Sequence, residues 1–146
     1  MQLPTYITGF TENGVTLREM NGQQFKQVVY NAARITRARA LHVEQPRYPL
    51  HYFRIDLLLR DERVSVLLHR YFPYVALAHY TSSVQIQFID DDTLMRELQP
   101  YYTVLSAAFL HEPFQPQAHR LAEIERRHEK HWRPNTNGDV IFNCWD

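Results

Sequence analysis

Cysteine and glycine are scarce in this chain of 146 residues. The single cysteine, Cys144, excludes an internal disulfide and favours a reducing compartment over secretion. Only four glycines are present, and neither of the common phosphate-binding patterns, G-x-x-x-x-G-K-S/T and G-x-G-x-x-G, occurs. We therefore expect no nucleotide-binding loop of either kind, and no cofactor.

Long apolar runs and an excess of charge of one sign are also missing. No stretch approaches the roughly 18 apolar residues of a membrane-spanning helix, and residues 1–6 lack the basic and apolar parts of a signal peptide. The 16 basic and 16 acidic residues cancel, which removes the general attraction on which non-specific nucleic-acid binding depends. We expect a cytoplasmic protein that does not bind membranes, and nucleic acid is a poor candidate for its partner.

The most strand-like part of the chain is residues 50–89. Within residues 84–88, apolar and polar side chains alternate with the period of two that is typical of a half-buried strand. This pattern places Val84, Ile86 and Phe88 on the buried face.

A second alternation covers residues 52–59, where every other side chain from Phe53 onward is apolar. The polar break at residues 60–63 suits a hairpin loop into a strand at residues 64–68. Pro73 cannot donate to a strand ladder, so a further strand begins there or lies at a sheet edge.

Two turn signals, Asn13-Gly14 and Asn21-Gly22, divide the N-terminal part of the chain. Asparagine and glycine adopt positive φ angles at little cost, which makes them typical of tight hairpin turns. We therefore predict short strands at residues 6–10 and 15–20.

Residues 25–30 can be interpreted in two ways. A third strand that ends near Tyr30 would continue the meander, whereas a helix over residues 23–39 would place Phe25, Val28 and Val29 on one apolar stripe. We favour the strand as far as Tyr30 and leave residues 31–38 open.

Helical patterns dominate the later part of the chain. Predicted helices cover residues 94–98, 101–110 and 117–132, and prolines interrupt them at Pro100, Pro113 and Pro116. We therefore expect one α+β domain over residues 1–146, in which an N-terminal and central antiparallel sheet of meander type, residues 1–90, is covered by C-terminal helices, residues 91–132.

The last segment, residues 133–146, is unusually apolar for a chain end, and we expect it to dock on the domain. Its pattern W-x-P-x-x-x-G-D-V-I-F-N-x-W-D begins at Trp132. This ending is similar to the C-termini of certain small uncharacterised bacterial proteins, some of them associated with toxin immunity. The resemblance covers this segment only and implies no catalytic residue.

Glu125, His128 and His131 are the strongest candidates for a metal site. Their spacing lets them share one side of a helix, although it differs from the H-E-x-x-H pattern of zinc peptidases. A charged helix end with histidines near its negative pole explains the same residues more simply. No metal is therefore favoured.

Three adjacent carboxylates, Asp90, Asp91 and Asp92, suit a hard cation such as Mg²⁺ in their chemistry. Adjacent residues of a regular element cannot all point at one ion, and capping of the helix at residues 94–98 explains them better. Their charge also makes them candidate contacts for a protein partner.

Arg70, Tyr71 and Tyr74 combine a basic side chain with aromatic rings. Such a group can form a stacking platform for single-stranded nucleic acid, but aromatic residues also serve cross-strand packing in a sheet. Packing is the favoured interpretation, and the three residues remain candidate binding residues.

Three functional hypotheses fit these patterns. We favour a non-enzymatic cytoplasmic protein that binds another protein of unknown identity, as a regulatory or immunity-type factor, because exposed aromatic and arginine side chains are enriched at interfaces. The second hypothesis is a small metal-dependent hydrolase that uses the histidines and carboxylates of residues 119–131. The third is a single-stranded nucleic-acid binder.

Overall fold

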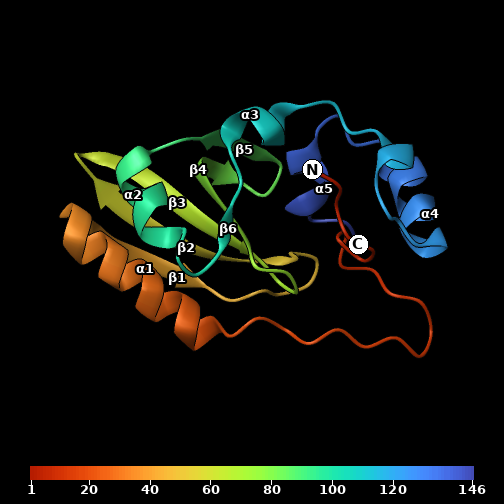
Figure 1. The fold of residues 1–146 in the computed structure, drawn as a ribbon, viewed down its shortest axis with the longest axis horizontal. Helices are drawn as coiled ribbons and strands as arrows, with labels where there is room; N and C mark the ends of the chain where they lie inside the picture. The colour runs from red at the N-terminus through yellow and green to blue at the C-terminus, as the bar shows by residue number, and fades with distance from the viewer.

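An antiparallel meander of five strands forms the centre of the fold (Figure 1). The strands are β1 (Arg39–Glu44), β2 (Tyr52–Leu59), β3 (Glu62–His69), β4 (Tyr74–Ser82) and β5 (Gln85–Ile89). A short sixth strand, β6 (Thr103–Val104), pairs with β4 in parallel. The structure, a computed structural model that covers residues 1–146, confirms the predicted α+β class and the central meander.

The connections between the central strands follow local turn chemistry. Arg60 and Asp61 have positive φ angles of 49° and 62°, so a two-residue turn that matches the strand twist joins β2 to β3. The hairpin predicted at residues 60–63 is therefore present. β4 begins directly after Pro73. Of the two alternatives predicted for this proline, the start of a strand is therefore the one observed.

Helix α1 (Gly22–Thr36) occupies the part of the chain where a strand was favoured. Asn21 accepts a hydrogen bond from the amide of Gln24 (3.0 Å) and so caps the helix rather than forming a hairpin turn. Phe25, Val28 and Val29 are buried on one side. The strand prediction to Tyr30 is wrong. The helix forms because it places these three apolar side chains on one face, where the sheet buries them.

Residues 6–10 and 15–20, also predicted as strands, form turns and irregular backbone. Tyr6 and Gly9 have φ angles of 73° and 87°, which lie outside the range of a β-strand. Only the turn at Asn13-Gly14 is present. The strand prediction at residues 6–10 is wrong because its backbone groups find partners on side chains of distant elements, among them Glu125, His69 and Asn143. The run at residues 15–20 is short, and its backbone bonds at Val15 and Met20 go to Glu12 and Arg70 rather than to a neighbouring strand.

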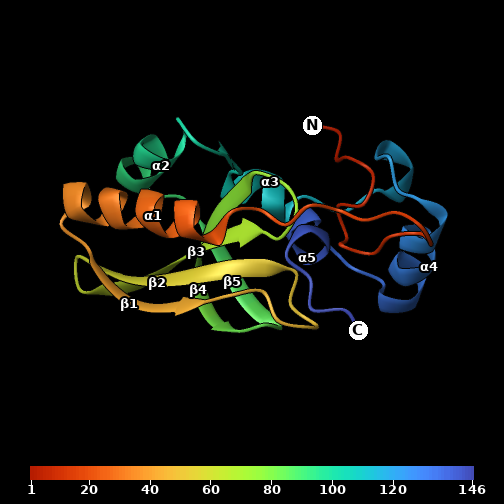
Figure 2. The same cartoon turned by 90° about the horizontal axis from the view of Figure 1, so that it is seen from below.

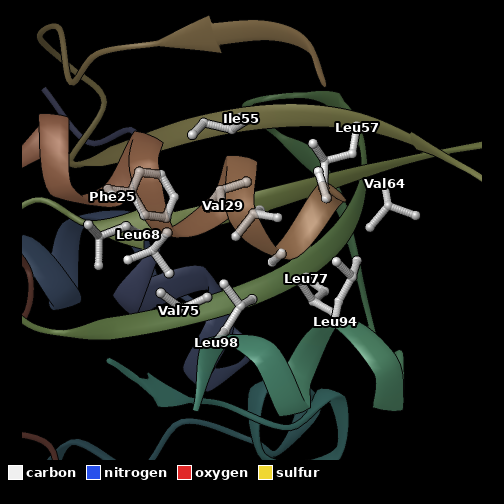
Figure 3. Close-up of a cluster of buried hydrophobic side chains, with 14 of the residues drawn as sticks. Phe25, Val29, Ile55, Leu57, Val64, Leu68, Val75, Leu77, Leu94 and Leu98 are labelled. Atoms are coloured by element: carbon white, nitrogen blue, oxygen red, sulfur yellow. The ribbon is translucent and has the colours of Figure 1, made fainter. Parts of the chain in front are cut away.

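One face of the sheet is covered by α1 together with helix α2 (Asp92–Leu98). Figure 2 shows both helices on the same side of the strands. The apolar side chains that alternate along β2 from Phe53 point into this layer, as predicted. Figure 3 shows Ile55 and Leu57 of β2 on the side of α1, while Leu94 and Leu98 of α2 lie beside Leu77 and Val75 of β4.

The opposite face is covered only at one end. There the N-terminal segment and the C-terminal part of the chain enclose a second apolar core, which includes Leu3, Ile7, Tyr52, Leu67, Phe88, Phe142 and Trp145. The C-terminal elements are α3 (Ala107–His111), the 3₁₀ turn η1 (Pro116–Ala118), α4 (Glu123–Trp132) and α5 (Asn137–Ile141). In Figure 1, α4 lies at the end of the molecule farthest from α2.

Two of the predicted helices are shorter than expected. Residues 101–110 do not form one helix, because β6 pairs with β4 and α3 begins only after its cap at Ser106. The helix predicted at residues 117–132 begins at Glu123, after the η1 turn. No helix combines the length and the apolar character that crossing a bilayer requires.

Candidate binding groove

A groove of about 310 Å³ separates the β4–β5 turn from the C-terminal segment. Ser83, Val84 and Ile86 line it on the strand side. The facing side chains come from the segment that carries the tryptophan-rich ending: Trp132, Arg133, Pro134, Asn135, Asp139, Cys144 and Trp145. The volume lies at the small end of the range of ligand pockets and accommodates one or two side chains of a partner.

Two tryptophans lie parallel at this groove, with ring centroids 6.5 Å apart and ring planes inclined by 2°. Trp145 is 6% exposed and belongs to the core, whereas Trp132 is 38% exposed. Trp145 therefore supports Trp132, whose outer surface remains available to a ligand.

Val84 lines the same groove and is 84% exposed. The sequence pattern placed it on the buried face, and this expectation is wrong because Val84 lies in the turn that precedes β5. Ile86 and Phe88 do follow the expected side, half-buried and buried respectively. The groove lining thus contains two exposed apolar side chains, Val84 and Trp132, together with polar residues such as Arg133 and Asn135.

The C-terminal wall of the groove is held by Asn143, a buried amide with four hydrogen bonds. Its nitrogen donates to the carbonyl oxygens of Thr8 (2.9 Å) and Val140 (2.8 Å). Its oxygen therefore accepts, from Nδ1 of His51 (2.9 Å) and from the amide of Trp145 (3.1 Å). This arrangement positions Trp145 before any ligand arrives.

Asp139 and Thr136 form a reciprocal cap at the start of α5. The Thr136 hydroxyl accepts from the Asp139 amide (3.2 Å), and the Asp139 carboxylate accepts from the Thr136 amide (3.1 Å).

The expectation that the tail docks is confirmed, since Val140, Ile141 and Phe142 are buried in the second core.

Replacement of Gly138 by alanine is expected to destabilise this wall. The added Cβ would lie 2.4 Å from Cε2 of Phe88 and 3.1 Å from the carbonyl oxygen of Leu110, and the shift that relieves these contacts costs about 1 to 3 kcal/mol. Thermal denaturation should show a lowered Tm for Gly138→Ala. The loss of stability caused by Gly138→Ala should be smaller in a Phe88→Leu background than in the wild type. Equal losses in the two backgrounds would contradict the assignment of Phe88 as the obstacle.

The N-terminal segment behind the groove is fastened by titratable side chains of other elements. The amide of Leu3 donates to Nδ1 of His119 (3.0 Å), and Nε2 of His69 donates to the carbonyl oxygen of Ile7 (2.6 Å). Nδ1 of His69 accepts from the amides of Tyr71 (3.0 Å) and Phe72 (3.2 Å), which fixes its tautomer.

Burial keeps these histidines neutral. Loss of hydration lowers the pKa of His69, which is fully buried, to about 3. Burial likewise lowers the pKa of His51, His119 and His128 from the ordinary value.

Glu125, predicted as a possible metal ligand, is fully buried and accepts four hydrogen bonds. The donors are the amides of Tyr6 (2.5 Å), Thr8 (2.9 Å) and Ala122 (3.0 Å), and the hydroxyl of Thr8 (2.7 Å). Both carboxylate oxygens are thus used to hold the N-terminal segment to α4.

His128 and His131, the other two metal candidates, have separate aromatic partners. His128 stacks on Phe10, with ring centroids 3.6 Å apart and planes inclined by 13°, and His131 packs edge-on against Trp132. The structure brings together no group of three His, Cys, Asp or Glu side chains in a geometry that suits a metal ion.

The three adjacent aspartates take different positions. Asp91 is the N-cap of α2, accepting from the amide of Leu94 (3.1 Å), and it also pairs with Arg60. Asp90 accepts from the amide of Ala107 (2.9 Å), and Asp92 is exposed in the first turn of α2. Capping, the favoured interpretation, describes Asp91, and Asp92 remains available to a partner.

Arg70 and Tyr71 lie together, with the guanidinium 5.2 Å from the ring centroid, while Arg70 also pairs with Glu19 (3.0 Å). Tyr74 packs instead against the second core beside Phe72, and burial raises its pKa. Tyr74 therefore contributes to packing rather than joining Arg70 and Tyr71 in one exposed platform.

Comparison of the chain with protein-family models, with curated proteins and with solved structures finds no match.

Proposed function

We propose that the protein binds another protein, and that the partner docks at the groove between the β4–β5 turn and the C-terminal segment. The observation that carries this proposal is the exposure of Val84 and Trp132 on one groove. Exposed apolar side chains grouped beside a polar rim mark interaction sites in folded proteins, and tryptophan and arginine are the residues most enriched in interface hot spots.

The rigidity of the groove supports the same function. Trp132 stacks on the ring of Trp145, and the amide of Trp145 is already held by a hydrogen bond to Asn143. Little side-chain freedom is therefore lost when a partner binds. Arg133 at the same site adds a positive charge and a planar donor group for the carbonyl or carboxylate groups of a partner.

An immunity-type or regulatory role is the particular form of this function that we propose, with a protein toxin as the partner. It draws on the resemblance of residues 132–146 to proteins associated with toxin immunity. These residues supply most of the groove lining. A cytoplasmic location fits a chain that contains one cysteine.

Affinity purification from the source organism tests the proposal. A partner should be retained by the wild-type protein and by the control Tyr48→Ala, which removes a side chain that is 70% exposed and does not line the groove. The double variant Val84→Asp/Trp132→Ala should lose it.

With the retained protein purified, Trp132→Ala alone should raise the Kd about 30-fold in titration calorimetry, the effect of a hot-spot tryptophan. Equal retention and equal affinity for wild type and both groove variants would exclude the groove as the docking site.

A further inference from the structure

The two edges of the sheet differ in how they are protected against pairing with another strand. β1 carries a bulge between Ala40 and His42, and the charged residues Arg39 and Glu44. Bulges and charges are the usual devices that prevent edge-to-edge association. β5 has the sequence Gln-Ile-Gln-Phe-Ile, without charge, proline or a bulged residue of its own.

The outer backbone edge of β5 has no partner within the chain. Residues 85–89 form backbone hydrogen bonds only in the ladder with β4, and β6 fills only the neighbouring half of the β4 edge, at Tyr74 and Val75. Gln85 and Gln87 are exposed. Helix α3 packs beside the end of β5, where its first amide donates to Asp90 (2.9 Å), but it forms no backbone hydrogen bond with the strand.

We propose that a second copy of this chain pairs with the outer edge of β5, antiparallel and about a two-fold axis, so that the two sheets become continuous. In a register centred on Gln87, Ile86 of one copy lies opposite Phe88 of its partner, and Gln87 lies opposite Gln87. The apolar Ile86–Phe88 pairs thus fall on one face. On the other face Gln87 meets Gln87, and Gln85 of each copy lies opposite Ile89 of its partner, so every pair recurs about the two-fold axis and none contains a charge.

Charge favours the second copy as the occupant. The edge carries no charge to be set against its own copy, and the formal net charge of the chain is zero at pH 7. Proteins near zero net charge have no general repulsion that keeps copies apart. The pairing does not involve Trp132, which is not part of the strand edge, although Ile86 belongs both to this edge and to the lining of the groove.

Sedimentation equilibrium of the full chain over a wide concentration range tests the pairing. Wild type should form a dimer, and Gln85→Lys/Gln87→Lys should raise its Kd at least about tenfold, because like charges then oppose one another across the strands. The corresponding variant Gln85→Glu/Gln87→Glu should be equally weakened alone. An equimolar mixture of the two should recover association as a heterodimer.

Ala40→Lys is the control, because it adds a lysine to the exposed edge strand at the other side of the sheet. It should leave the dimer unchanged. A wild-type chain that stays monomeric at all concentrations would overturn the proposal, and so would a dimer that persists in the lysine variant or fails to re-form in the mixture of opposite charges.

Discussion

Glu125→Ala should lower the free energy of unfolding by about 5 kcal/mol, because it leaves four buried or part-buried donors without their acceptor. Three of the donors are the amides of Tyr6, Thr8 and Ala122, and the fourth is the hydroxyl of Thr8. Water cannot replace the carboxylate without opening the contact between the N-terminal segment and α4, since Glu125 is fully buried. Urea denaturation followed by tryptophan fluorescence measures the loss.

Glu123→Ala serves as the control for this prediction. Glu123 lies in the same first turn of α4 but is exposed, and its only partner is Arg127 one turn later (3.0 Å). An exposed pair of this kind contributes at most about 0.5 kcal/mol. If the Glu125 and Glu123 variants lost similar stability, the four hydrogen bonds to Glu125 would not be holding the N-terminal segment.

Glu125 shows why a sequence pattern identifies the role of a side chain less well than the helix or strand that carries it. Glu125 was a metal candidate because it lies one turn before His128 on a helix, which is a local relationship. Three of its four hydrogen bonds come from Tyr6 and Thr8, far away along the chain. No local period could link these residues, so the structural role of Glu125 was out of reach of the sequence.

The central strands were predictable because their burial depends on local alternation. Phe53 and Ile55 lie on the expected face, and Asp91 caps the helix that follows. The segment around Asn21 was ambiguous, since asparagine before glycine suits both a hairpin turn and a helix N-cap. Burial of Phe25 against the sheet, a tertiary contact, decides in favour of the helix.

The candidate groove was only half predictable. The apolar ending indicated that Trp145 docks, and the structure confirms it. That the docked segment would face the β4–β5 turn depends on the path of the chain between residues 90 and 132. Val84 supplied a misleading signal, because its place in the alternation of β5 concealed that it belongs to the turn.

The second large effect is expected from acid. His69 is neutral in the folded protein because burial lowers its pKa from 6.5 to about 3, so the unfolded chain binds a proton more readily below pH 6.5. Stability must then fall as the pH falls between these two values, by about 1.4 kcal/mol per pH unit and on the order of 3 kcal/mol near pH 4.5. His51, His119 and His128 act in the same direction.

Urea denaturation of wild type and His69→Asn at a series of pH values measures this slope. The asparagine oxygen can accept the amides of Tyr71 and Phe72 in place of Nδ1, but the side chain does not titrate. The variant should be less stable at neutral pH, because the bond to the carbonyl of Ile7 is lost, yet its stability should decline less steeply toward acid. An equal slope in the two proteins would place the acid sensitivity elsewhere. His42→Asn makes the same replacement at an exposed histidine and is the control for the change of side chain itself.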